Sequence, residues 1–252
     1  MGGQFFYVEE WGPMIFKKAF PKLLCQMSEV GDLEAMKQIL SYIKQSDVSD
    51  FPDLLCEMSE EGELNVVIQI FAYLKHENME MDMEVKNCDN EVIRTPLFRA
   101  ATKGRHQICE YLITKERANI EARDYYQQTA LIMAACYNRT EVIKVLLHHN
   151  ANVKAEDKYG THAACWAAKN GHLDALKMLV EKDGDVIDLK GTDGETPLIA
   201  AAAFYPARVD ACKYLVEEKN ANVNLKDNTG KTALQHARDP RIIEILKNKG
   251  AK

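Results

Sequence analysis

The chain has 252 residues, of which 46% are hydrophobic and 28% are charged, and its formal net charge is −6. This composition excludes a disordered or fibrous chain and suffices for a sizeable buried core. No apolar run reaches about 18 residues and the N-terminus lacks a basic region followed by an apolar one, so we expect neither a membrane span nor a secretory signal.

Charge and cysteine usage narrow the class of partner and the compartment. Residues 1–90 hold 17 acidic and 7 basic residues, which leaves 21 acidic and 25 basic residues in the remainder. An acidic first part, with no dense Lys/Arg stripe in the rest, argues against nucleic acid as a partner. The seven Cys show no C-x-x-C spacing. We expect buried free thiols in a reducing compartment, the cytoplasm or the nucleus.

Residues 1–19 form an apolar N-terminal segment. Its aromatic residues are Phe5, Phe6, Tyr7, Trp11 and Phe16. Exposing so many rings to water is costly, so we expect this segment to cap the open end of the chain or to lie along the chain's own groove. A membrane or partner anchor is the alternative, although little basic charge flanks the segment.

Two similar stretches follow within residues 20–76. LLCQMSEVGDLEAMKQIL begins at Leu23, and LLCEMSEEGELNVVIQIF begins at Leu54, 31 positions later. Each stretch has an apolar run, a Gly that suits a tight turn, and a second apolar run at helical spacing. We predict two helix–turn–helix units, which are divergent copies of the clearer units downstream.

Residues 77–94 are predicted to be an extended acidic loop. In MEMDMEV, which starts at Met79, Met and acidic residues alternate with the period of two that is typical of a strand. Two interpretations stay open. The loop folds over the second and third units, or its Met side chains contact a partner, a role for which Met is adaptable.

The units become regular from residue 95 to 252. Thr95, Thr129, Thr196 and Thr232 each precede a short run that contains Ala, and the small-residue marks at positions 100, 134, 167, 201 and 237 are spaced by 34, 33, 34 and 36 residues. Thr is a good helix N-cap, and a Pro after it suits the first helical position. A Gly or Asn turn and a second, apolar helix follow. One such unit cannot bury its apolar face alone, so the period predicts a stacked solenoid.

These units resemble a known family. TPLFRAATKGRHQICEYLI, AAKNGHLDALKMLV and GETPLIAAA are similar to the ankyrin repeat, with its T-P-L-H-x-A signature and its period near 33. The resemblance is specific over about residues 95–251 and weaker in 20–76. It implies an all-α ankyrin-repeat solenoid of about seven helix pairs with short extended finger loops, folded as one domain over residues 20–252. His162 stands where the family places the capping Thr, so we expect a different bond at that helix start.

No catalytic or cofactor motif is found in the sequence. The motifs G-x-x-x-x-G-K-[ST], G-x-G-x-x-G, G-x-S-x-G and H-E-x-x-H are all absent. The pair His148-His149 has no Cys or carboxylate partner at metal-ligand spacing, and His suits a helix C-terminus. We therefore expect no enzyme activity, no cofactor and no metal site.

The resemblance implies a module that binds a partner protein on its concave face, as an adaptor or scaffold. We expect the chain to be a monomer. In the ankyrin family, the finger tips and the ends of the first helices contact partners. At the matching positions the expected partner-binding residues are Tyr125, Tyr126, Gln128, Tyr137, Lys158, Tyr159, Lys169, Asn170, Asp193, Phe204 and Tyr205. Tyr is favoured at binding hot spots. The alternative for each ring is that it packs on a neighbouring finger of the same chain. Trp166, next to the pair Ala167-Ala168, is expected to be half-buried packing and not a binding hot spot.

Two alternatives remain within the binding class. One is a receptor for a peptide or a degron within a ubiquitin ligase. The other is a protein inhibitor or regulatory subunit of an enzyme. The fold does not choose among these roles.

Overall fold

Fourteen α-helices lie as seven consecutive pairs in the part of the chain that the computed structural model describes, residues 13–46, 50–79, 85–86, 92–204 and 208–251. The pairs are α1 (Pro13–Val30) with α2 (Leu33–Ser46), α3 (Asp50–Glu61) with α4 (Leu64–His76), α5 (Pro96–Lys103) with α6 (His106–Thr114), α7 (Ala130–Cys136) with α8 (Thr140–His148), α9 (Ala163–Asn170) with α10 (Leu173–Lys182), α11 (Pro197–Ala203) with α12 (Val209–Lys213), and α13 (Ala233–His236) with α14 (Pro240–Asn248). A 3₁₀ turn, η2 (Gly184–Ile187), follows α10, and a π-helical turn, η3 (Tyr214–Glu218), extends α12.

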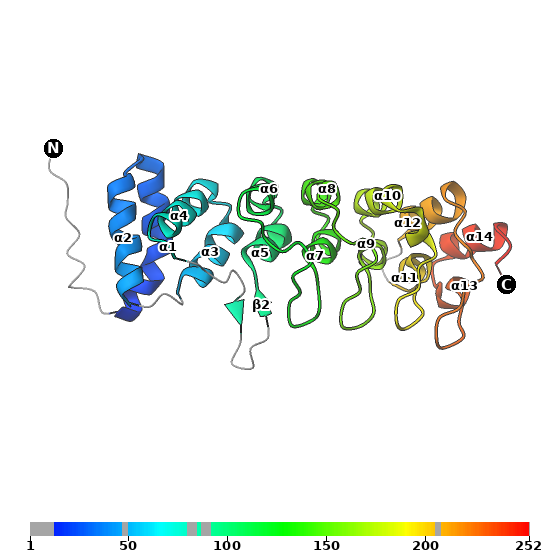
Figure 1. Ribbon diagram of the computed structural model, residues 1–252. Coiled ribbons are helices and arrows are strands. Elements are labelled where there is room, and N and C mark those ends of the chain that lie inside the picture. The colour runs from blue at the N-terminus through cyan, green and yellow to red at the C-terminus, as the bar shows by residue number, and fades with distance from the viewer. Residues whose placement is uncertain (1–12, 47–49, 80–84, 87–91, 205–207, 252) are drawn as a thin grey trace.

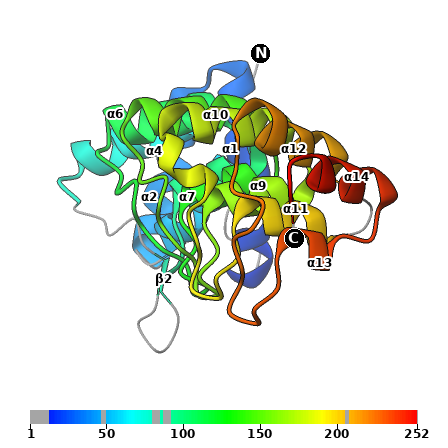
Figure 2. The ribbon, with the colours of Figure 1, turned by 90° about the vertical axis from the view of Figure 1, so that its right-hand side faces the viewer.

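The pairs stack in a single row, as Figure 1 shows. From α5 onward, the first helices lie in a middle layer, the second helices lie above them, and the loops between pairs project below as fingers. Figure 2, which looks along the row, shows the same three levels. The predicted all-α solenoid is confirmed, including the helix–Gly–helix interpretation of the two stretches that begin at Leu23 and Leu54.

The predicted Thr caps are confirmed where the first helices begin. The hydroxyl of Thr95 accepts a hydrogen bond from Phe98 N–H at 3.0 Å, and Thr129 and Thr196 do the same for the N–H three residues on, at 3.3 Å. His162 makes no such bond at the start of α9. Burial lowers the pKa of His162, and its neutral ring donates from Nε2 to the carbonyl of Leu189 at 3.0 Å. The expected difference at this helix start is therefore present.

Small side chains let the first helices approach closely. Ala100, Ala134, Ala167 and Ala201 mark the same position in four units, and all are fully buried. The second helix of each of these units buries a Leu at the matching position, 112, 146, 179 and 215. Truncating such a Leu to Ala typically costs about 2–5 kcal/mol, so this continuous core holds the row together.

Arginine side chains join the turn of one unit to the next. Arg105, Arg139 and Arg208 each donate from Nε to a carbonyl near the end of the preceding unit's first helix, that of Glu60, Thr102 and Lys169, at 2.9 to 3.1 Å. Arg105 directly follows the turn residue Gly104. The residue that follows Gly62 in the same way is Glu63, and a carboxylate cannot donate. The first pair therefore lacks this link to the second, and in Figure 1 α1 and α2 run in a different direction from the later pairs.

The N-terminal boundary differs from the sequence interpretation. The sequence placed the division between the N-terminal segment and the repeats at residues 19 and 20, but α1 begins at Pro13 and runs across that point. Pro52 lies in the first turn of α3, whereas the equivalent Pro21 lies inside α1. Phe20 is buried and meets Tyr42 edge-to-face at 6.1 Å. Residues 1–12 lie outside the described residues, so the capping role of this segment stays a prediction.

Two short strands lie between α4 and α5. β1 (Val85–Lys86) pairs antiparallel with β2 (Val92–Arg94). Met79 packs partly buried against the core, while residues 80–84 and 87–91 lie outside the described residues. Over the described ranges, no helix combines the length and the apolar character that crossing a membrane requires.

Candidate partner-binding surface

The four loops that lead into α7, α9, α11 and α13 are the regular fingers, numbered here in chain order. An Asp side chain shapes three of them. Oδ1 of Asp124 accepts from the N–H groups of the residues two and four positions later, at 2.9 and 2.8 Å. Asp157 makes the same pair of bonds at 2.9 Å, and Asp227 makes it at 2.9 and 3.0 Å. Each Asp thereby fixes a tight turn at the finger tip. In the third finger, Gly191 stands at this position.

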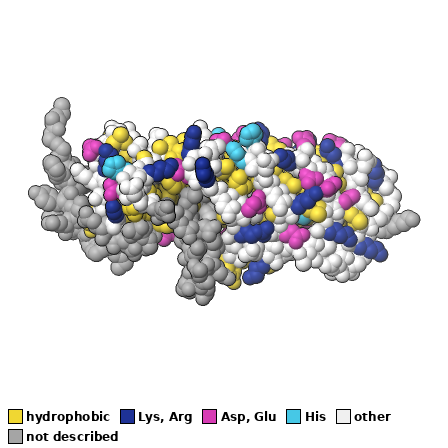
Figure 3. Space-filling view, viewed as in Figure 1, with side chains coloured by type: hydrophobic (Ala, Val, Ile, Leu, Met, Phe, Trp, Pro, Cys, Tyr) yellow, Lys and Arg dark blue, Asp and Glu magenta, His cyan; other side chains and the backbone are white. Residues whose placement is uncertain are grey.

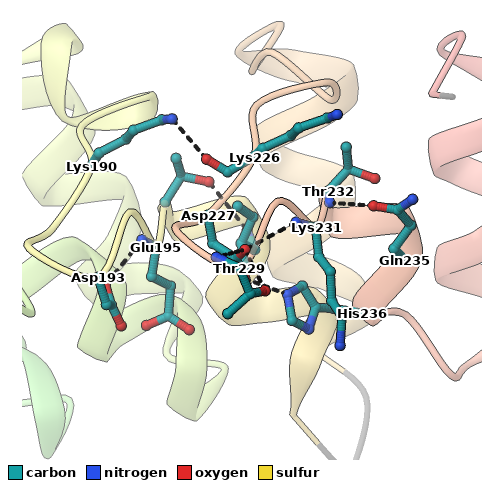
Figure 4. Close-up of polar contacts among 12 residues, drawn as sticks. Lys190, Asp193, Glu195, Lys226, Asp227, Thr229, Lys231, Thr232, Gln235 and His236 are labelled. Carbon is teal, nitrogen blue, oxygen red and sulfur yellow. Dashed lines mark hydrogen bonds and ion pairs between the residues drawn. The ribbon is translucent and has the colours of Figure 1, made fainter.

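The second carboxylate oxygen ties two of these fingers to their helices. Trp166 Nε1 donates to Asp157 Oδ2 at 2.9 Å, and the ring of His236 contacts Asp227 Oδ2 at 2.6 Å. Figure 4 shows Asp227 at the centre of its network, with Thr229 and Lys231 on one oxygen and His236 on the other. Burial alone would raise the pKa of Asp227, but the bonds from Thr229, Lys231 and His236 lower that pKa overall.

The finger tips are hydrogen-bonded to one another. Lys158 N–H donates to the carbonyl of Tyr126 at 2.8 Å, Thr192 N–H to Gly160 at 3.1 Å, and Asn228 N–H to Asp193 at 3.0 Å. The second and third tips lie in close contact, since a Cβ built on Gly160 would lie 2.2 Å from Thr192 Cβ. A Cβ on Gly191 would lie 1.9 Å from the carbonyl oxygen of Gly160. Glycine at both positions is what lets these tips touch.

Three tyrosines and a lysine form a tip cluster, defined as Tyr125, Tyr126, Lys158 and Tyr159. The three rings are exposed by 46%, 46% and 60%. The rings of Tyr125 and Tyr126 meet edge-to-face at 5.2 Å, and Lys158 Nζ lies 4.6 Å from the centre of the Tyr125 ring. The cluster therefore combines exposed aromatic surface with a fixed cation.

A second group, the helix-end cluster, lies where α7, α9 and α11 end. It consists of Tyr137, Lys169 and Phe204, and the two rings are exposed by 49% and 39%. Lys169 Nζ lies 4.2 Å from the centre of the Phe204 ring and 5.0 Å from that of the half-buried Trp166. Because Trp166 also bonds to Asp157, it links this cluster to the finger that carries Lys158 and Tyr159. We call the two clusters together the aromatic patch.

Other residues that were expected to bind a partner make hydrogen bonds within the chain. Gln128 is half-buried and donates its N–H to Asp124. Asn170 is half-buried and donates from Nδ2 to the carbonyl of Cys136 at 3.0 Å. Asp193 lies exposed on the third tip, where its carboxylate accepts from Glu195 N–H at 3.0 Å. Tyr205 lies outside the described residues.

Two further residues of this surface were missed in the sequence. Gln127 adopts a positive φ of 58°, where the other three fingers carry glycines. Arg123 Nη1 donates to the carbonyls of Gln127 and Glu156, at 3.1 and 2.7 Å, and so braces two fingers. Aligning the four finger sequences reveals the unusual Gln, since a non-glycine residue there carries backbone strain. No local sequence signal identifies the role of Arg123.

Groups with potential chemistry elsewhere in the described residues are buried or dispersed. Cys165 Sγ lies 3.3 Å from His162 Nε2, but burial raises the thiol pKa, which is the reverse of what an activated nucleophile needs. Within the same ranges, no group of three or more His, Cys, Asp or Glu is arranged to hold a metal ion. Figure 3 shows acidic and basic side chains interspersed over the visible face.

Comparisons with known proteins agree with this architecture. The family model of ankyrin repeats in three copies matches residues 55–157, 123–190 and 164–252. A comparison with curated protein sequences finds no match.

Two solved structures are similar. An ankyrin repeat domain (ABAYE2397) from Acinetobacter baumannii AYE is 23% identical with a TM-score of 0.64, and the match covers 79% of this chain and 98% of that one. A chain of the complex between the predatory endopeptidase Bd0816 of Bdellovibrio bacteriovorus and the immunity protein Bd3460 is 26% identical with a TM-score of 0.62. That match covers 77% of this chain and 97% of the other.

Proposed function

Because this chain belongs to the ankyrin repeat family, whose members generally act as protein–protein interaction modules, we propose that it is a non-catalytic adaptor or scaffold that binds a partner protein through the aromatic patch. One observation carries the proposal. Seven large hydrophobic side chains are exposed in the described residues, and five of them belong to the patch. The other two, Val30 and Leu33, flank the turn between α1 and α2.

The patch has the chemistry of a binding hot spot. Tyrosine rings supply rigid contact area together with a hydroxyl, and they lose little conformational entropy on binding. The tip-to-tip hydrogen bonds and the Asp157–Trp166 bond hold the fingers in place before a partner arrives. Such preorganisation lowers the entropic cost of association. The strained Gln127 beside the two tyrosines is consistent with a functional constraint on this finger.

A protein inhibitor of an enzyme is the second candidate. The solved complex of an endopeptidase with an immunity protein supports it, since a chain of that complex shares this fold. For either role we propose a monomer in the cytoplasm or nucleus. The six cysteines in the described ranges are free thiols, which supports a reducing compartment.

Affinity capture from the native cell with the wild type, a patch variant and a control variant tests the proposal. The patch variant carries Tyr125→Ala, Tyr126→Ala and Tyr137→Ala, and the matched control carries Val30→Ala and Leu33→Ala, which truncates the other two exposed hydrophobic side chains. Hot-spot residues are worth about 2 kcal/mol or more each, so the patch variant should lose its partner while the control keeps it. A partner retained by both variants would refute the proposal, and inhibition of a captured enzyme would select the second candidate.

A further inference from the structure

We propose that residues 1–12 dock in the groove between α2 and α4 of their own chain, and that their aromatic side chains fill it. This segment lies outside the described residues and carries Phe5, Phe6, Tyr7 and Trp11. The groove belongs to the first two units, whereas the aromatic patch lies on the later fingers and helix ends. The inference is therefore independent of the proposed function, and either can fail while the other stands.

The groove is an open cavity of about 970 Å³ between two neighbouring second helices. Among its lining residues, Met36 and Leu40 of α2 are buried, Tyr73 of α4 is half-buried, and Leu33 and Ala72 are exposed. Pockets of about 300–1,000 Å³ enclose a drug-sized molecule, which is as large as a few side chains. The groove can therefore take more than one aromatic ring.

A pair of aromatic rings is missing from this groove when it is compared with the next one along the row. Between α4 and α6, the ring of Phe71 lies 6.2 Å from that of Tyr111. Counted from the turn glycine of each unit, Leu40 and Gln69 take these two places between α2 and α4, and both line the groove. The first pair also lacks the arginine link to the second and runs in a different direction (Figure 1). The unfilled space therefore matches aromatic side chains.

The charged residues beside the groove are paired with one another. Lys37 Nζ contacts Glu34 Oε1 at 2.8 Å, and Lys44 Nζ contacts Glu77 Oε2 at 2.6 Å. These two pairs cancel, so they select neither an acidic nor a basic occupant. The surface left for contact is apolar, and covering it removes apolar area from water. An apolar, aromatic segment is the occupant that this surface favours.

The segment is attached where it can reach the groove. α1 and α2 are joined by a short turn and run antiparallel, so Pro13 lies at the end of the pair that carries Lys44. Phe5 to Tyr7 precede Pro13 by six to eight positions, which an extended chain spans with up to about 20–28 Å. The stretch of α2 from Lys44 to Leu33 rises only about 16 Å. A short tether also gives an effective concentration in the millimolar range, which favours this segment over a second copy or a separate partner.

Photo-cross-linking within the intact chain tests the inference. A benzophenone side chain replaces Phe6, the purified protein is irradiated, and the cross-linked tryptic peptides are identified by mass spectrometry. Trypsin releases residues 45–75, which include all of α4 except its last residue, separately from residues 38–44 of α2. We expect cross-links to the part of α4 between Gln69 and Tyr73, in material with the mass of a single chain.

Two variants with the same added charge sharpen the test. Ala72→Glu places a carboxylate on the wall of the groove, where a docked ring would bury it, and should reduce the α4 cross-link at least about fivefold. Gln107→Glu places a carboxylate at an exposed position of α6 that does not line the groove, and it should leave the cross-link unchanged. Circular dichroism and urea midpoints verify that both variants are folded.

Four results would overturn the inference. Cross-links confined to α1 and α2 would place the segment on the outer side of the first pair, and cross-links between two chains would make a second copy the occupant. An α4 cross-link that persists in Ala72→Glu would exclude the groove as the docking site. The absence of any cross-link within the chain would show that the segment does not dock. None of these results bears on partner binding by the aromatic patch, which affinity capture tests separately.

Discussion

The close approach of the second and third fingers makes a prediction with an internal control. Gly160 and Gly230 occupy the same position in their fingers, with φ values of 73° and 81°. A Cβ on Gly230 meets nothing within 4 Å, whereas a Cβ on Gly160 would lie 2.2 Å from Thr192 Cβ and 2.4 Å from Thr192 N. Gly→Ala at the two sites therefore shares the backbone strain but differs in the contact between fingers.

The magnitudes follow from these contacts. A left-handed backbone costs an L-residue about 1–2 kcal/mol, which both variants should show. Gly160→Ala must also push the two tips apart, losing the bond from Thr192 N–H to the Gly160 carbonyl, which measures 3.1 Å. That loss adds about 1–2 kcal/mol, because the carbonyl of the buried Gly160 is left unpaired, whereas the N–H of the exposed Thr192 can bond to water. We expect Gly160→Ala to destabilise the chain by about 2–4 kcal/mol and Gly230→Ala by about 1–2 kcal/mol.

Equilibrium urea unfolding followed by circular dichroism measures both losses under identical conditions. The midpoint should fall further for Gly160→Ala, with similar slopes for the two variants. Equal losses for the two variants would refute the reasoning, because they would mean that the fingers tolerate the added methyl group and that tip contact contributes nothing measurable.

Three further predictions concern single groups. Burial lowers the pKa of His162 in the fold, so the unfolded state protonates first; stability should fall as the pH drops below about 6.5, and His162→Gln should reduce that slope in urea titrations. The pKa of Asp227 is lowered in the fold, so its carboxylate stabilises the fold above the pKa of the unfolded state and less at lower pH. Asp227→Asn should therefore be less stable than wild type at pH 7, and the difference in stability should narrow below about pH 4 in urea titrations. Arg139→Ala removes the bond to the carbonyl of Thr102 and should lower the free energy of unfolding by about 1 kcal/mol, measured by urea titration, whereas no change would exclude a role for these arginines in joining units.

Much of the repeat architecture could be predicted because its signals are local. A Thr cap bonds to an N–H three residues away, as in Thr95, and the left-handed turn at Asn138 lies where other units carry Gly. The helix across Pro21 was not predicted. Pro52, 31 positions later, lies in the first turn of α3, where Pro is tolerated, whereas Pro21 lies inside α1. A helix is shaped by its packing as well as by its own residues, and Phe20 is buried against the next helix.

The candidate site could be predicted only in part, because its contacts connect different units. The exposed tyrosines stand at positions that the family resemblance indicated. Their role in binding stays a prediction. The contacts that organise them connect different units: Lys158 with Tyr125, Lys169 with Phe204, and Gly160 with Thr192. Such contacts depend on how neighbouring fingers are placed, and no spacing along the chain encodes that placement.

Site-specific photo-cross-linking in the native cell tests the central claim most directly, because it maps the interface with whichever protein binds. A benzophenone side chain would replace Tyr126 or Tyr159 on the tips, or Lys144 or Glu181, which are exposed on the outer helices α8 and α10. We predict that one partner protein cross-links to the two tip positions and not to the two outer positions. Cross-linking confined to the outer helices would contradict the account.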